Sequence, residues 1–146
     1  MGMERFDQIC PEIGVREIRV CKVPEMLSLG LPSKYFLLEL YCNEQDCDCR
    51  RVLVQFIPEE DNFKVAASIN YGWEKAGYYK KWSRDPKLWR EMAGATLEPS
   101  EEQGLHAKTF LRVFKDLVRD RMLIAVFRRH YRLVKDRLQV CGAGFG

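Results

Sequence analysis

The sequence predicts an α+β fold in which an antiparallel β-meander of about four strands packs against two C-terminal α-helices. Two observations carry this prediction. Segments between residues 15 and 71 alternate apolar and polar side chains, whereas apolar side chains after residue 105 recur at helical spacing. Strands followed by a helical pair favour helices packed on a sheet. The length of 146 residues predicts a single domain, residues 1–146, with one core.

The predicted strands are short segments separated by turn-forming residues. They cover residues 15–23, 35–42, 51–57 and 63–71. In the second segment Phe36, Leu38, Leu40 and Cys42 share one face, while Glu39 lies on the other face. We therefore expect the face that contains Cys42 to receive the helices.

Helical signals begin at Pro86, which fits the first turn of a helix that ends near Met92 and is capped by Asp85. The C-terminal third predicts two helices separated by a break near Asp120. The apolar stripe of the first is Phe110, Leu111, Phe114, Leu117 and Val118, and that of the second is Leu123, Val126, Phe127, His130, Val134 and Leu138. We expect the second stripe to pack on the sheet.

Composition limits the class of protein. Apolar residues make up 47% and charged residues 31% of the chain, which is ordinary for a globular protein and excludes a disordered chain. Apolar runs are far shorter than the roughly 20 residues of a membrane helix, so we expect no membrane association. No basic-then-apolar leader opens the sequence, so we expect a cytoplasmic protein.

Charge is distributed unevenly along the chain. Residues 1–104 carry 14 basic and 18 acidic side chains, whereas residues 105–146 carry 10 basic and 3 acidic ones. A basic last helix, together with the aromatic and lysine-rich segment 73–90, would suit nucleic acid. A solvated helix face explains the same charges, so nucleic-acid binding is an alternative that the sequence does not favour.

Three of the six cysteines lie between two predicted strands, in a cysteine knuckle at residues 42–49 with the spacing C-x4-C-x-C. Cys42 ends one strand and Cys49 nearly begins the next, so strand pairing would hold both close. Cys47 and Cys49 are two residues apart and present their thiols on one side of an extended backbone. The three sulfurs therefore converge with little additional ordering.

This convergence predicts one structural zinc ion, because a soft site with three thiolates suits zinc. The acidic neighbours Glu44, Asp46 and Asp48 disfavour free thiolates, and a divalent cation would offset that charge. A closed zinc site takes four ligands, and the candidates for the fourth are His130, His106, Cys141, Cys21 and Cys10. We expect His130, because packing its stripe on the face of Cys42 would carry the imidazole to the thiols. A metal-free loop and a Cys47/Cys49 redox pair are the alternatives.

With these residues in view, the chain resembles a family of uncharacterised bacterial proteins that often carry a C-terminal SEC-C metal-binding motif. The resemblance spans roughly residues 35–135 and rests on short motifs. They are Tyr41-Cys42, Cys47-Asp48-Cys49-Arg50-Arg51-Val52, Asn70-Tyr71-Gly72-Trp73-Glu74, Tyr79-Lys80-Lys81-Trp82 and Arg129-His130-Tyr131. The sequence ends in Cys141-Gly-Ala-Gly-Phe-Gly146, where no SEC-C tail is expected. The resemblance implies a metal site and no established activity.

The sequence therefore predicts a small cytoplasmic domain with a structural zinc site formed by Cys42, Cys47, Cys49 and His130, acting as a binding or interaction module for an unknown protein partner. One alternative is a nucleic-acid-binding protein that uses the last helix and segment 73–90. The other is a zinc or thiol enzyme, which needs an open coordination position or a reactive thiol.

Overall fold

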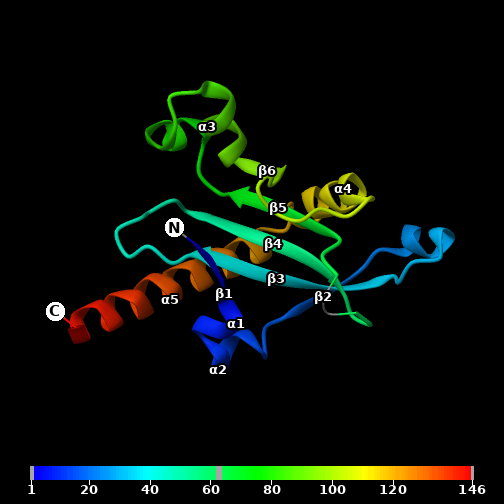
Figure 1. Cartoon of the computed structure of the whole chain (residues 1–146), viewed down its shortest axis with the longest axis horizontal. Coiled ribbons are helices and arrows are strands. Elements are labelled where there is room, and N and C mark those ends of the chain that lie inside the picture. The colour runs from blue at the N-terminus through cyan, green and yellow to red at the C-terminus, as the bar shows by residue number, and fades with distance from the viewer. Residues whose placement is uncertain (1, 62–63, 146) are drawn as a thin grey trace.

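The computed structural model describes residues 2–61 and 64–145, with side chains in the last helix as far as Gln139. In these residues the chain forms one antiparallel sheet of six strands, with the two C-terminal helices packed on one of its faces (Figure 1). The predicted α+β class is confirmed.

The sheet has the order β1-β3-β4-β5-β6, and β2 pairs with the same outer edge of β3 as β1. The strands are β1 (Met3–Arg5), β2 (Arg19–Lys22), β3 (Lys34–Cys42), β4 (Arg51–Pro58), β5 (Ala67–Gly72) and β6 (Gly94–Leu97). Neighbours β2 to β5 form the predicted meander. The first predicted strand is shorter than expected because the turn that follows α2 continues to Glu17, whose amide donates to the Ile13 carbonyl at 3.0 Å. Phe63, where the last predicted strand starts, lies outside the described residues.

Short helices surround the sheet, and two longer ones follow it. They are α1 (Phe6–Ile9), α2 (Pro11–Gly14), the 3-10 helices η1 (Pro24–Leu29) and η2 (Ala76–Trp82), α3 (Pro86–Met92), α4 (Ala107–Leu117) and α5 (Arg121–Phe145). Asp85 caps α3 as predicted, by accepting a hydrogen bond from the Lys87 amide at 3.0 Å. The expected break near Asp120 separates α4 from α5, and the Asp120 carboxylate accepts from the Met122 amide at 2.9 Å.

The core lies between the sheet and the two C-terminal helices. Strand β4 contributes Val52, Val54 and Phe56 to one cluster of buried side chains. The helices complete that cluster with the residues Phe110, Phe114, Leu123, Phe127 and Val134. The predicted stripe of the last helix therefore faces the core, and aromatic contacts such as Phe114 to Phe127 join α4 to α5.

The expected orientation of β3 is wrong. Tyr35, Leu37, Glu39 and Tyr41 are buried against the helices, whereas Phe36, Leu38 and Leu40 are only half-buried on the opposite face. Both faces of this strand are largely apolar, so alternation alone does not choose between them. Glu39 enters the core because buried donors bind its carboxylate, and a satisfied buried charge is tolerated where an isolated one is not.

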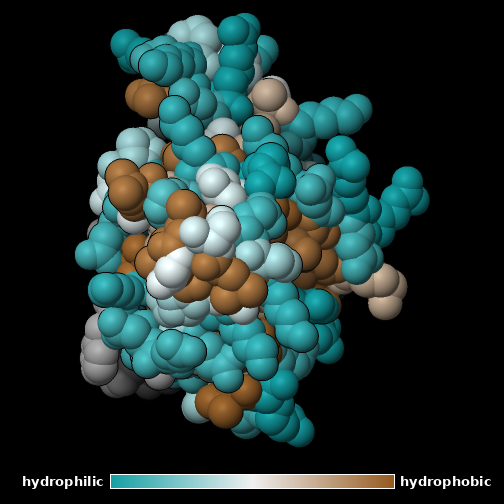
Figure 2. Space-filling model, turned by 90° about the vertical axis from the view of Figure 1, so that its right-hand side faces the viewer, coloured by the Kyte–Doolittle hydropathy of each residue, from teal (hydrophilic) through white to brown (hydrophobic). Residues whose placement is uncertain are grey.

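The face of the molecule drawn in Figure 2 is predominantly polar. In Figure 2, which views the end of the molecule where η1 lies, apolar side chains gather near the centre of a polar face. Leu27 and Leu29 of η1 are among the exposed large apolar residues. Among the described residues, no helix combines the length and the apolar content that crossing a membrane requires.

We expect Leu123→Ala and Phe127→Ala each to lower the free energy of unfolding by about 2–5 kcal/mol, because each leaves a cavity between α5 and the sheet. Denaturant unfolding measures both. Met122→Ala is the matched control, since Met122 is 73% exposed beside Leu123 and should change stability by less than about 0.5 kcal/mol. Losses that match the control would contradict this packing.

Candidate metal centre

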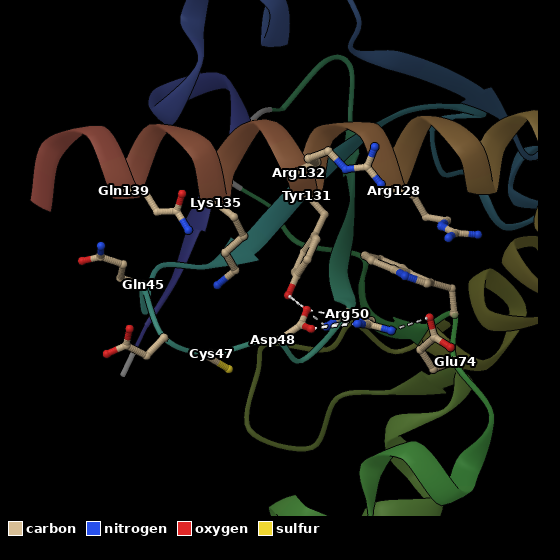
Figure 3. A pocket seen from close by; sticks show the side chains of 12 residues that line it. Gln45, Cys47, Asp48, Arg50, Glu74, Arg128, Tyr131, Arg132, Lys135 and Gln139 are labelled. Atoms are coloured by element: carbon tan, nitrogen blue, oxygen red, sulfur yellow. Dashed lines mark hydrogen bonds and ion pairs between the residues drawn. The ribbon is translucent and has the colours of Figure 1, made fainter. Parts of the chain in front are cut away.

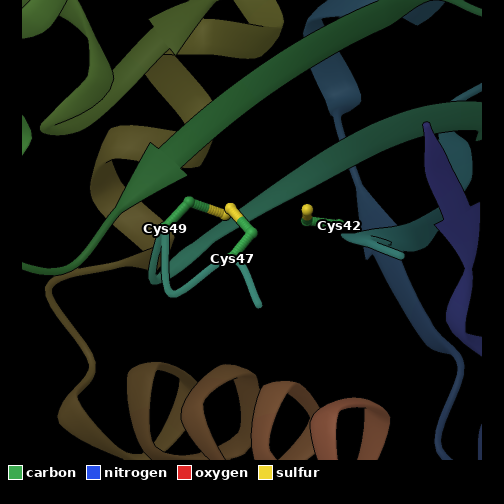
Figure 4. A group of neighbouring side chains, drawn as sticks. All are labelled: Cys42, Cys47 and Cys49. Carbon is green, nitrogen blue, oxygen red and sulfur yellow. The ribbon is translucent and has the colours of Figure 1, made fainter. Parts of the chain in front are cut away.

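The three cysteines of the knuckle converge, as the spacing predicts. Cys42 is the last residue of β3, and Cys47 and Cys49 lie in the loop that leads to β4. Their sulfur atoms all lie within 4.8 Å of one another (Figure 4). Tetrahedral coordination with Zn–S bonds near 2.3 Å separates two sulfurs by about 3.8 Å, so small side-chain movements would enclose an ion. The cluster can hold a metal ion.

Strand pairing and the N-terminal strand hold the start of the knuckle. The β3–β4 ladder extends to the pair Leu40 and Leu53, two residues before Cys42. Strand β1 continues alongside, because Met3 pairs with Cys42 itself. The Asn43 amide then donates to the Gly2 carbonyl at 3.0 Å. Cys42 is therefore fixed on a paired strand.

Tyrosines of α5 and η2 hold the end of the knuckle. Arg50 adopts a φ of 46°, a left-handed conformation that is rare for a residue other than glycine. The Tyr131 hydroxyl accepts from the Arg50 amide at 3.3 Å and donates to the Asp48 carboxylate at 2.8 Å. The Tyr79 hydroxyl donates to the Arg50 carbonyl at 3.0 Å. These contacts from α5 and η2 keep the strained backbone next to Cys49 in place.

Cations offset the acidic side chains around the thiols. Arg50 pairs with Asp48 at 2.9 Å and with Glu74 at 3.3 Å. Lys135 donates to the carbonyls of Cys42 and Glu44 at 3.2 and 2.8 Å. Its ammonium group therefore lies next to the cluster, where positive charge favours a thiolate.

Hydrogen bonds within the cluster give the three thiols different pKa values. The contact from the Cys49 thiol, helped by Lys135 and opposed by burial, lowers the pKa of Cys42 to about 5. The same contact and burial raise the pKa of Cys49, and burial raises the pKa of Cys47. The acidic loop was expected to keep all three cysteines protonated, and for Cys42 this expectation is wrong because Cys49 and Lys135 act on it directly.

His130 lies elsewhere in the core. Its Nδ1 atom is 2.7 Å from the Glu39 carboxylate, and its Nε2 atom is 3.1 Å from the Glu17 carboxylate. Its ring stacks on Phe6 with a centroid separation of 4.0 Å. Both nitrogens are thus engaged, and the structure does not bring His130 to the thiols. The expected route failed because α5 packs on the face of β3 that carries Glu39.

Three other candidates for a fourth ligand are also apart from the cluster. Cys10 and Cys21 are buried in the N-terminal segments, and His106 precedes α4. The side chain of Cys141 lies outside the described residues. Among the residues that the structure describes, these three cysteines are the only group of His, Cys, Asp or Glu side chains placed to hold a metal ion, and no fourth such side chain joins them.

Two open clefts reach the centre at Cys47, which is half-buried. One lies toward α5 and includes Arg128, Tyr131 and Lys135 (Figure 3). The other lies toward η2 and includes Lys81 and Trp82. Cys42 and Cys49 are buried, so solvent reaches the cluster at Cys47.

Comparison with family models, curated proteins and solved structures finds no match to this chain. The resemblance to the bacterial family stays a prediction that these comparisons do not test. Functional inference therefore depends on the geometry of the described residues.

We expect zinc binding at pH 7 to release roughly two protons, because Cys42 is already a thiolate while Cys47 and Cys49 are not. Calorimetry in buffers of different ionisation enthalpy measures this number. As the pH falls through about 5, Cys42 gains its proton, so the release should rise toward three and the affinity should fall. A release of three protons at pH 7 would contradict the Cys42 thiolate.

Proposed function

We propose that this chain is a zinc-binding domain in which Cys42, Cys47 and Cys49 hold one structural zinc ion and support a binding or interaction module. The convergence of three thiol sulfurs within 4.8 Å is the observation that carries the proposal. Clustered thiolates favour a soft or borderline metal over calcium or magnesium, which prefer oxygen. Zinc is the ion that proteins most often place in such a structural site.

Zinc would close a connection between elements that are distant along the chain. Cys42 ends β3 and Cys49 precedes β4, while Tyr131 and Lys135 bind the same loop from α5. An ion bound to the knuckle would therefore stabilise the end of the hairpin and the surface it shares with α5. Metal binding energy of this kind contributes directly to folding.

We propose a reducing compartment, the cytoplasm, for this domain. The five cysteines with described side chains are all free thiols, and clustered free thiols with no disulfide suit a reducing environment. Membership of the bacterial family that the motifs resemble is part of the same proposal. An interaction role agrees with this family, whose resemblance implies a metal site and no activity.

A second candidate is a zinc or thiol enzyme, and the exposure of the centre at Cys47 favours it. A catalytic zinc site keeps three protein ligands and leaves a fourth position for water or substrate. Labelling of the native metal-loaded protein with a thiol reagent separates a zinc site from a thiol enzyme. A structural site protects all three cysteines, whereas a thiol enzyme exposes one to rapid modification.

The test of the proposal is zinc content by elemental analysis of protein purified without chelator and under reducing conditions. We expect about one zinc per chain for the wild type and a loss of most of it in Cys49→Ser, because two thiolates bind zinc much more weakly than three. Removal of zinc from the wild type by a chelator should lower its melting temperature.

Two variants provide matched controls. Cys21→Ser removes a buried thiol away from the knuckle and should keep the metal. His130→Ala should also keep the metal while it lowers stability, because His130 binds Glu39 and Glu17. Wild-type protein without metal would refute the zinc site, and loss of zinc from His130→Ala would restore His130 as a ligand.

A further inference from the structure

The outer face of α5 carries arginines that the fold does not use. Arg121, Arg128 and Arg132 are exposed and make no ion pair or hydrogen bond with the described residues. We call these three residues the arginine face. Other arginines of the same helix are paired, Arg129 with Glu17 and Arg137 with Glu12. The unpaired charges are therefore concentrated on one side of the helix.

Two clefts meet at this arginine face. The knuckle cleft, of about 460 Å³, lies between α5 and the cysteine knuckle (Figure 3). Trp73 also lines it. The helix cleft, of about 490 Å³, follows α5 past Arg121, Ile124 and Leu133. Arg128 and Arg132 line both clefts. From Arg121 to Gln139 the helix extends about 27 Å, which spans several phosphate spacings of a nucleic-acid strand.

The charge of these clefts is suited to an anionic polymer. In the knuckle cleft Asp48 and Glu74 are already paired with Arg50, which leaves Asp46 against Arg128, Arg132 and Lys135. In the helix cleft Asp136 is the one acidic residue among those that line it in the described part of the chain. Guanidinium groups bind phosphate oxygens in a bidentate manner.

An accessible aromatic ring makes nucleic acid a better occupant than an acidic peptide. Trp73 and Tyr131 line the knuckle cleft, edge to face with centroids 5.2 Å apart. Nucleic-acid bases stack on such rings, whereas the carboxylates of an acidic peptide do not. The other rings are less suited, because Lys81 covers Trp82, Lys80 covers Trp89 and Lys135 covers the buried Tyr131. Trp73 is half-buried and is the ring of the cleft that a base can reach.

We propose that a single strand of nucleic acid binds along α5, with its phosphates at the arginine face and a base against Trp73. This inference names a partner for the proposed interaction module. It rests on the surface beside the zinc site and does not require a particular metal. Segment 73–90 contributes to this surface through Trp73.

The test measures fluorescence anisotropy of a short labelled single-stranded oligonucleotide with the full-length, metal-loaded protein. We expect Arg128→Gln with Arg132→Gln to weaken binding at least tenfold, because each lost phosphate contact reduces affinity at low salt. Lys108→Gln with Lys115→Gln removes the same charge from exposed sites on α4 and should change affinity less than twofold. The wild-type dependence of log affinity on log salt should have a slope of about −2, as three phosphate contacts on a single strand predict.

A second readout reports stacking. Oligonucleotide binding should quench tryptophan fluorescence in the wild type, and Trp73→Phe should bind with little quenching. Equal losses in the two charge variants, equal binding of polyglutamate, or tighter binding of the matching duplex would overturn the proposal, as would no binding at low salt. The zinc content of the proteins separates the two proposals. Arginine variants that lose oligonucleotide binding but retain zinc leave the metal site intact. A wild-type protein that binds the oligonucleotide but lacks zinc refutes only the metal site.

Discussion

The position of α5 on the sheet depends on one buried carboxylate. Glu39 lies in the core face of β3, where an unpaired charge would cost several kcal/mol. His130 approaches it at 2.7 Å, and the Tyr41 hydroxyl donates to it at 2.6 Å. Glu17 faces the second nitrogen of His130. The ring thus contacts one carboxylate through each nitrogen, and these two contacts fix the rotation of α5 about its axis and its position along β3.

Because a helix is rigid, fixing His130 also places its neighbours. Tyr131 reaches Arg50 and Asp48, and one turn later Lys135 reaches the carbonyls of the cysteine knuckle. Arg128 and Arg132 of the same helix line the cleft that opens beside this loop. His130, which the sequence predicted as a metal ligand, thus acts on the thiols indirectly: it positions α5, and α5 supports the loop.

Local signals in the sequence predicted more than long-range ones. The cysteine spacing predicted the thiol cluster because strand pairing brings its ends together, and Asp85 with Pro86 marked the start of α3. Strands β1 and β6 have three and four residues, too few for a periodic pattern. The prediction chose the wrong core face of β3 because both faces are apolar. This wrong face led to the choice of His130 as the fourth ligand. Nothing in a single sequence indicates that Tyr131 would meet Arg50, 81 residues away.

The claim that three thiolates of the knuckle hold one zinc ion is tested most directly by X-ray absorption at the zinc edge of the purified protein. Three sulfurs at about 2.3 Å and one lighter ligand at about 2.0–2.1 Å are the expected coordination shell. The lighter ligand should persist in His130→Ala, because His130 is engaged by Glu39 and Glu17. A shell of nitrogen and oxygen with one sulfur or none would contradict the account.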